Sequence, residues 1–363
     1  MSINERYRTI RMKLLQLRPN ERITRLCAFS WLMAGIHAYG AVHLSKVASQ
    51  IPGDAVNCSK TRRMERIVDN QSIAVRAWYA PIAKQWLQAA AETVGEIRLI
   101  LDSTKIGFGY QLLLVSLAFR RRAVPIAWCW LKGPKGHSSA ETQVSLLHQV
   151  KDWLPEGVRV VLVGDTEFEA GEVIQQVANW HWGYVLRQKP NNQVQRSGQW
   201  QDFGSLATHP GQSTWLENVP LTLKHALSTH LLVHWAVGEE RPWLLATNLP
   251  ARTAALQAYR RRMWIDESFG DLKSNGFDLE SSHLRDAERL SRLTLAVVLL
   301  YIWFLAVGQR VIKNGWRPLV DRKDRRDLSI FQIGLRFVDR CIVNNVSFPI
   351  HLFPFPRPKL SGS

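Results

Sequence analysis

The order of apolar and polar residues divides the chain into helical and strand-rich stretches. Between Arg22 and Ile51, apolar and small residues mix with few strand signals, which predicts two or three short helices. A further helix is predicted through Trp78 and Trp86. From Ile97 onward, short apolar runs are separated by polar connections, a pattern typical of strands. We therefore expect a helical N-terminal part followed by a region built on a sheet.

Seven elements are predicted in succession after this change of pattern. They are strands over 97–102, 111–119 and 123–130, a helix over 139–154, a strand over 158–164, a helix over 169–179 and a strand over 183–187. The strands lack strict alternation, as strands buried on both faces do. The order β-β-β-α-β-α-β is that of the ribonuclease H-like topology. The sequence thus predicts an α/β fold with a ribonuclease H-like mixed sheet flanked by helices.

The pattern changes twice more before the chain ends. Residues 191–240 are polar and rich in Gly, Ser, Thr and Gln, with strand-like pieces at 221–223 and 230–237, which predicts a β-rich insertion. A core strand is then predicted over 243–247, and one long helix over 253–275.

The charge of the chain points to a polyanionic partner. The formal net charge is +17, from 47 Lys and Arg against 30 Asp and Glu. Nucleic acid is the leading candidate because its phosphates dominate such binding. The basic run 60–66 lies among the predicted N-terminal helices, which favours that region as a reader of duplex DNA.

Neither a disulfide framework nor a membrane span is predicted. The four cysteines are scattered without a CxxC pair, so we expect reduced thiols, as in a cytoplasmic protein. The most apolar run, residues 293–307, is shorter than the roughly 20 residues that span a bilayer, and predicts a buried helix. The first residues are polar and basic, unlike a signal peptide. We expect no membrane partner.

One face of the long predicted helix carries four polar side chains. At about 100° per residue, Arg262, Asp266 and Lys273 fall within about 60° of Tyr259. A hydroxyl, a guanidinium, a carboxylate and an ammonium therefore share one stripe. Such a stripe combines a metal ligand with groups that bind phosphates.

Two more acids follow predicted strands. Asp102 and Asp165 each end an apolar run, and the first and fourth strands of a ribonuclease H-like sheet lie side by side. We therefore expect their carboxylates to converge with an acid from the long helix. Three carboxylates suit two Mg²⁺ ions, which prefer oxygen ligands and catalyse phosphodiester hydrolysis or transesterification.

The helix spacing resembles the signature of the cut-and-paste DDE transposases of the insertion-sequence-four group, which includes the transposon-five transposase. That signature is Tyr, two residues, Arg, three residues, Glu, six residues, Lys, and this chain has Tyr259, Arg262, Asp266 and Lys273 at those spacings. The resemblance runs from the strand of Asp102 to about residue 284. It implies a transposase and endonuclease that uses Mg²⁺, with Mn²⁺ as a substitute. It also implies a homodimer on double-stranded DNA that binds transposon ends and target DNA, in the cytoplasm at the bacterial nucleoid.

The resemblance also implies which residues contact DNA. Tyr259, Arg262 and Lys273 would contact phosphates at the transposon end. Arg187 stands where the family places an arginine on the strand after the second Asp. Trp243 stands where the family places a tryptophan that stacks on a flipped base.

The chain departs from the family at the third acid. The family has Glu where this chain has Asp266, and Glu267 follows directly. Asp266 has the expected position but is shorter by one methylene, whereas Glu267 has the length but lies about 80° round the helix from Tyr259. We favour Asp266 as the metal ligand beside Asp102 and Asp165, and keep Glu267 as the alternative.

These inferences give a division of the chain and three hypotheses for its function. The predicted segments are a helical DNA-binding domain over 1–92, a catalytic core over 93–190 and 242–312, a β-rich insertion over 191–241 and a basic tail over 313–363. The leading hypothesis is a DNA transposase that acts by two-metal hydrolysis and strand transfer. The alternatives are a DNA-binding protein derived from a transposase that has lost catalysis, and a stand-alone Mg²⁺-dependent nuclease.

Overall fold

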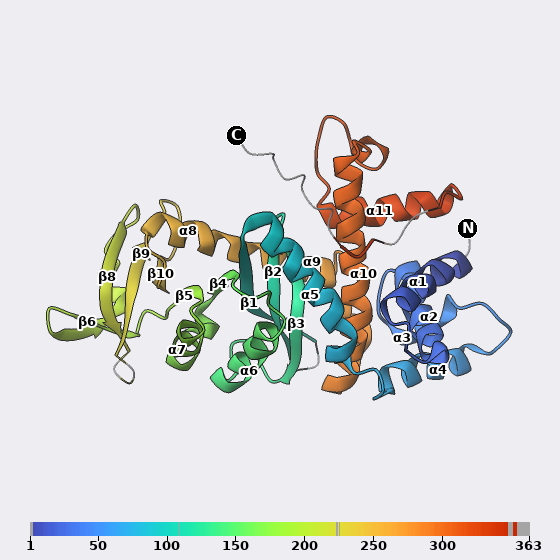
Figure 1. Cartoon of the computed structure of the whole chain (residues 1–363), viewed down its shortest axis with the longest axis horizontal. Helices are drawn as coiled ribbons and strands as arrows, with labels where there is room; N and C mark the ends of the chain where they lie inside the picture. Colours follow the sequence, from blue (N-terminus) through green and yellow to red (C-terminus); the bar gives the residue numbers. More distant parts are fainter. Residues whose placement is uncertain (1–2, 108, 223, 225, 348–350, 354–363) are drawn as a thin grey trace. The chain divides into compact units, whose positions relative to one another are not determined.

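The computed structural model describes residues 3–107, 109–222, 224, 226–347 and 351–353. The chain forms two compact units (Figure 1). The first comprises Met1–Ala89, Ile106–Tyr110 and Phe269–Ser363, and the second comprises Ala90–Lys105 and Gln111–Ser268. The protein is thus a mixed α/β protein, and the two units divide it differently from the five predicted segments.

The second unit is built on one large sheet. Its ten strands run in the order β3-β2-β1-β4-β5-β10-β9-β8-β6-β7. The first five are β1 (Glu96–Ile106), β2 (Tyr110–Phe119), β3 (Arg122–Lys132), β4 (Arg159–Gly164) and β5 (Gly183–Arg187). They occur where the apolar runs predict them, and β1 pairs with β4, and β4 with β5, in parallel. The first and fourth strands therefore lie side by side, as expected.

Helices flank this sheet. Helix α6 (Ala140–Lys151) packs on β3 and on α7 (Gly171–Asn179), which also contacts β5. Helix α8 (Arg252–Arg260) packs on β4 and β5. In Figure 1, α7 and α8 lie on opposite sides of β5. Both faces of this part of the sheet are covered, which explains why its strands are apolar throughout.

The prediction that Asp102 ends a strand is wrong. Strand β1 continues for four more residues, through Ser103, Thr104 and Lys105 to Ile106. The polar residues are tolerated because β1 still pairs with β2 on its other side. Strand β4, however, ends at Gly164, which is paired with Leu101. Asp102 therefore still lies beside the point where the neighbouring strand ends.

The predicted β-rich insertion contains strands, and they extend the main sheet. Strand β10 (Trp243–Thr247) pairs with both β5 and β9. The strands of the insertion are β6 (Gln193–Arg196), β7 (Gln199–Asp202), β8 (Ser213–Leu221) and β9 (Leu227–His234). Strand β8 is longer than the strand-like piece at 221–223, because it pairs with β9 along its length, and β9 begins and ends three residues before the piece at 230–237.

The long predicted helix is interrupted, which corrects the prediction of one helix over 253–275. Helix α8 ends at Arg260, a 3₁₀ turn spans Arg261–Met263, and α9 runs from Trp264 to Leu272. A 3₁₀ turn has 3.0 residues per turn in place of 3.6, so it changes the angle between residues before and after it. The stripe predicted for a regular helix is therefore altered at Arg262.

The first unit is helical. It contains α1 (Ile3–Leu17), α2 (Ile23–Tyr39), α3 (Leu44–Ser49), α4 (Asn57–Asp69), most of α5 (Val75–Val94), α10 (Ala287–Lys313) and α11 (Ile330–Val343). Helix α10 is the one helix among the described residues that is long and apolar enough to cross a membrane, but it is almost wholly buried within the protein. The prediction of a buried helix over 293–307 is confirmed.

Helix α11 lies within the segment predicted as a basic tail, and it packs tightly on α10. A Cβ atom on Gly308 would lie 1.9 Å from the carbonyl oxygen of Ile330, and one on Gly334 would lie 1.8 Å from that of Phe304. Only glycine permits this approach of two backbones. Part of the predicted tail is therefore core, and its residues 348–350 and 354–363 lie outside the described residues.

Candidate active site

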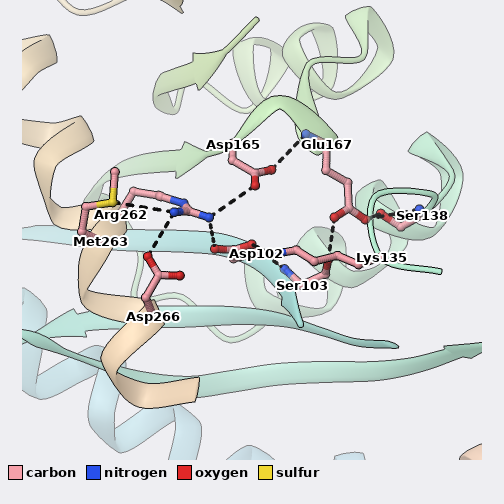
Figure 2. Close-up of polar contacts among 9 residues, drawn as sticks. All are labelled: Asp102, Ser103, Lys135, Ser138, Asp165, Glu167, Arg262, Met263 and Asp266. Carbon is pink, nitrogen blue, oxygen red and sulfur yellow. Dashed lines mark hydrogen bonds and ion pairs between the residues drawn. The ribbon is translucent and has the colours of Figure 1, made fainter. Parts of the chain in front are cut away.

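Three acids of the second unit converge on one guanidinium (Figure 2). The Nη2 atom of Arg262 lies 2.6 Å from Oδ2 of Asp102 and 3.3 Å from Oδ2 of Asp165. Its Nη1 atom lies 3.1 Å from Oδ2 of Asp266. Asp102 lies on β1 and Asp165 directly follows β4, whereas Arg262 lies in the 3₁₀ turn before α9 and Asp266 in the first turn of α9. The structure thus brings together the three acids that the sequence favours, with Arg262 between them.

Burial and charge make this cluster electrostatically unusual. The side chain of Asp102 is fully buried, and burial raises its pKa to about 7 against the opposing effect of Arg262. The guanidinium of Arg262 is itself only 12% exposed. Burial acts against its charge, but the carboxylates of Asp102, Asp266 and Asp165 outweigh this and raise its pKa. Arg262 is therefore the counter-ion of the cluster.

Glu267 lies away from these acids. Its side chain is 65% exposed, and its carboxylate pairs with Arg122 at the start of β3 at 3.4 Å. Adjacent helical residues point about 100° apart, so Asp266 and Glu267 cannot face the same partner. Of the two alternatives for the third acid, the structure places Asp266 in the cluster.

Glu167 was not predicted from the sequence, and it connects the loop that carries Lys135 and Ser138 to the acid cluster. Its backbone N–H donates to Oδ1 of Asp165 at 2.9 Å, and its carboxylate accepts hydrogen bonds of 2.5 Å from the hydroxyls of Ser103 and Ser138. The same loop brings Nζ of Lys135 to 3.9 Å from Oδ1 of Asp102. The signal in the sequence is an acid two residues after Asp165, at the start of the turn that follows β4.

Three residues predicted to contact DNA lie together in the second unit. The rings of Trp243 and Tyr259 meet edge to face, with centroids 5.0 Å apart. Arg187 donates to the carbonyl of Pro242 at 3.1 Å. Burial raises the pKa of Tyr259 to about 12, although the neighbouring Arg187 and Arg262 lower it. Tyr259 is almost fully buried, so its hydroxyl stays protonated at neutral pH.

Lys273, the fourth residue of the predicted stripe, belongs to the first unit. It follows the end of α9, and its ammonium lies 3.5 Å from a carboxylate oxygen of Glu280. The structure therefore joins Arg262 and Asp266 at the acid cluster and places Tyr259 with Trp243 and Arg187.

The three carboxylates of the acid cluster are groups that could bind a divalent cation, and in the structure they contact the guanidinium of Arg262. Carboxylate oxygens are ligands that Mg²⁺ prefers, and here three carboxylates already direct oxygens at one cationic group. Among the described residues, no three His, Cys, Asp or Glu side chains stand close enough together to share a metal ion. The three carboxylates are therefore of the right chemical type for a hard cation, but as placed they lie around the guanidinium of Arg262 and too far apart to share a metal ion.

One family model matches just under half of the chain. Residues 128–303 match the family model described as "Transposase DDE domain". This match supports a DDE transposase. The matched region includes Asp165, Arg262 and Asp266, whereas Asp102 lies before it.

One solved structure similar to this chain is described as a piggyBac transposase synaptic complex with hairpin DNA. The two chains are 9% identical, the likeness covers 99% of this chain and 84% of that chain, and the TM-score is 0.41. No curated protein matches the sequence.

Proposed function

We propose that this protein is a DNA transposase that cleaves transposon ends and joins them to target DNA by cut-and-paste transposition. The observation that carries the proposal is the convergence of Asp102, Asp165 and Asp266 on the guanidinium of Arg262. The match of residues 128–303 to the transposase DDE domain supports it. The spacing of Tyr259, Arg262, Asp266 and Lys273 further supports the insertion-sequence-four group.

The sheet supports a ribonuclease H-like catalytic core. The order β3-β2-β1-β4-β5, with β1, β4 and β5 parallel, is the arrangement expected of that topology. It places Asp102 on one strand beside Asp165 at the end of the next. The paired strands β1 and β4 thus fix the positions of Asp102 and Asp165, and the third acid, Asp266, comes from helix α9.

In this mechanism, Asp102, Asp165 and Asp266 would hold Mg²⁺, or Mn²⁺ in its place. Bound metal would activate the attacking oxygen and stabilise the leaving oxygen of the phosphodiester. Arg262 keeps the buried carboxylate of Asp102 neutralised and, when it leaves the acids, offers its guanidinium to a DNA phosphate. Glu167 holds the loop of Lys135 against the cluster.

The partner proposed is double-stranded DNA, bound by a homodimer because cut-and-paste transposition needs two ends held together. The net charge of +17 supports a polyanionic partner. We assign contacts with the transposon end to Arg187, Trp243, Tyr259 and Lys273. The N-terminal helices are proposed as a DNA-binding domain, in a protein of the bacterial cytoplasm that associates with the nucleoid.

The proposal is tested by incubating the purified protein with Mg²⁺ and duplexes made from the DNA that flanks its gene. We expect cleavage at an inverted repeat by the wild type, followed by transfer of the freed 3′ end to a plasmid. The variants Asp102→Asn and Asp165→Asn bind the same duplex without cleaving it. A wild type that binds the duplex and leaves it intact would contradict catalysis.

Two observations favour a second candidate, a DNA-binding protein that has lost catalysis. Arg262 occupies the position between the acids, and the third acid is Asp266 where the family has Glu. Asp266→Glu separates the two functions: a gain of cleavage supports lost catalysis, and unchanged or reduced cleavage supports present activity. Cleavage without any strand transfer would instead indicate a stand-alone nuclease.

A further inference from the structure

The first, helical unit contains a basic pocket, which is separate from the acid cluster of the second unit. The pocket has a volume of about 250 Å³ and lies between the first turn of α2 and one face of α4. Its lining includes four arginines, Arg22, Arg25, Arg63 and Arg66, together with Ile67 and Asn70. The volume is below the roughly 300–1,000 Å³ of sites for drug-sized ligands, so it suits a small group.

Helical geometry explains why the arginines meet here. Residues 63, 66, 67 and 70 are spaced i, i+3, i+4 and i+7, so they share one face of α4. Ile67 is buried and forms the apolar floor, while Arg63 and Arg66 are exposed. Arg22 precedes α2 and makes no side-chain cap hydrogen bond. Four arginines therefore line the pocket: Arg63 and Arg66 from α4, Arg25 from the first turn of α2, and Arg22 directly before that helix.

Among the described residues, three of the four pocket arginines lack a counter-ion. Arg25 pairs with Glu21, which also pairs with Arg18. In the part of the chain that the structure describes, the side chains of Arg22, Arg63 and Arg66 have no ion pair. Three unpaired cations around one pocket repel one another, and an anion that binds between them relieves that repulsion.

We propose that this pocket binds a phosphate of the DNA backbone, and this rests on the proposed function. Guanidinium groups match the geometry of phosphate oxygens and bind them through paired hydrogen bonds. A DNA phosphate is favoured over a free one because the chain has an excess of positive charge that suits a long polyanion. The contact sets the position of the helical unit on the duplex without reading bases.

The test measures binding of the full chain to a fluorescent duplex in EDTA, so that cleavage does not interfere. The double variant Arg63→Gln/Arg66→Gln is expected to bind about 10- to 100-fold more weakly, the effect of losing charged hydrogen bonds to one phosphate. The slope of log affinity against log salt should fall by about 1. The matched control is Arg336→Gln/Arg340→Gln, which removes two exposed arginines of α11 that lie outside the basic run 60–66 and do not line the pocket.

A neutral methylphosphonate scanned along the duplex identifies the source of the phosphate. At one position it should weaken binding by the wild type and leave the double variant unaffected. Equal losses in the Arg336→Gln/Arg340→Gln control and the pocket double variant would overturn the pocket, since they indicate that only the total charge matters. Wild-type affinity in the double variant, or the absence of a coupled methylphosphonate position, would also overturn it. A wild type that binds no DNA contradicts the proposed function as well, whereas cleavage with unaffected pocket variants contradicts the pocket alone.

Discussion

Replacing Arg262 by Gln removes the counter-ion of the acid cluster and should destabilise the second unit. Removing one partner of a buried ion pair costs about 3–5 kcal/mol, and Asp102 meets this condition because its side chain is fully buried. The half-exposed pair with Asp266 adds only about 0.3–0.5 kcal/mol. We expect the lower end of the range, about 3 kcal/mol at pH 8, because Asp102 relieves part of the cost by taking up a proton.

Thermal unfolding followed by circular dichroism in EDTA measures this loss. For a folding unit of 150–250 residues, 1 kcal/mol corresponds to about 2–4 °C, so the melting temperature should fall by about 6–12 °C. The control is Arg260→Gln, which removes an exposed arginine two residues away. This control should melt within about 2 °C of the wild type, since surface substitutions rarely exceed 0.5 kcal/mol.

The loss of stability in Arg262→Gln should depend on pH, being larger at pH 8 than at pH 5.5. Burial raises the pKa of Asp102 to about 7, above its usual 3.8, so the folded protein binds this proton more tightly than the unfolded chain. The stability that Asp102 contributes is therefore greatest at low pH and is lost as pH rises through about 7. At pH 5.5 Asp102 is mostly protonated and needs Arg262 less. A deficit that is equal at pH 5.5 and pH 8, or absent at pH 8, would refute the role of Arg262 as counter-ion.

Three more predictions concern the cluster and the helical unit. Asp165→Asn should lower the cleavage rate by about 10³-fold, because a metal supplies several kcal/mol of charge stabilisation. The cleavage rate of Glu267→Gln should stay within about threefold of the wild type, and gels of the cleavage products compare the two variants. Glu167→Gln should raise the Mg²⁺ concentration needed for half-maximal cleavage by about 10-fold, as expected for a residue that supports metal ligands, and an unchanged Mg²⁺ titration would contradict this. Gly334→Ala should cost about 1–3 kcal/mol of unfolding free energy in urea, because its Cβ would meet the carbonyl of Phe304; wild-type stability would show that α10 and α11 separate freely.

The strands of the core were predictable because each is short, apolar and bounded by turn residues. Strands β2, β5 and β10 begin and end within one residue of the predicted ranges. Their boundaries are encoded locally, since burial on both faces demands a continuous apolar run. The end of β1 was not predictable in this way. Residues 103–105, near its end, are polar, and they stay in the strand because of pairing with β2, which the apolar pattern of β1 itself does not indicate.

The sequence also does not predict that the strands of the insertion pair with those of the main sheet. Composition indicates strands between residues 191 and 241, but it does not say which strand pairs with which. Strand β10 has β5 on one edge and β9 on the other, so the insertion continues the sheet of the core. Partner choice depends on which edges are open in three dimensions, and hydrophobic periodicity along one segment carries no information on that.

Position outweighs residue type in the choice between Asp266 and Glu267. Residue type favours Glu267, because glutamate has the longer reach, but a side chain on the wrong side of a helix cannot use that reach. Asp266 lies in the first turn of α9, and its carboxylate pairs with the guanidinium of Arg262, which also contacts Asp102. Glu267 projects toward Arg122 instead. The spacing along the helix therefore predicts which acid joins Asp102 and Asp165 better than the residue type does, because spacing determines the direction of a side chain and residue type determines only its length.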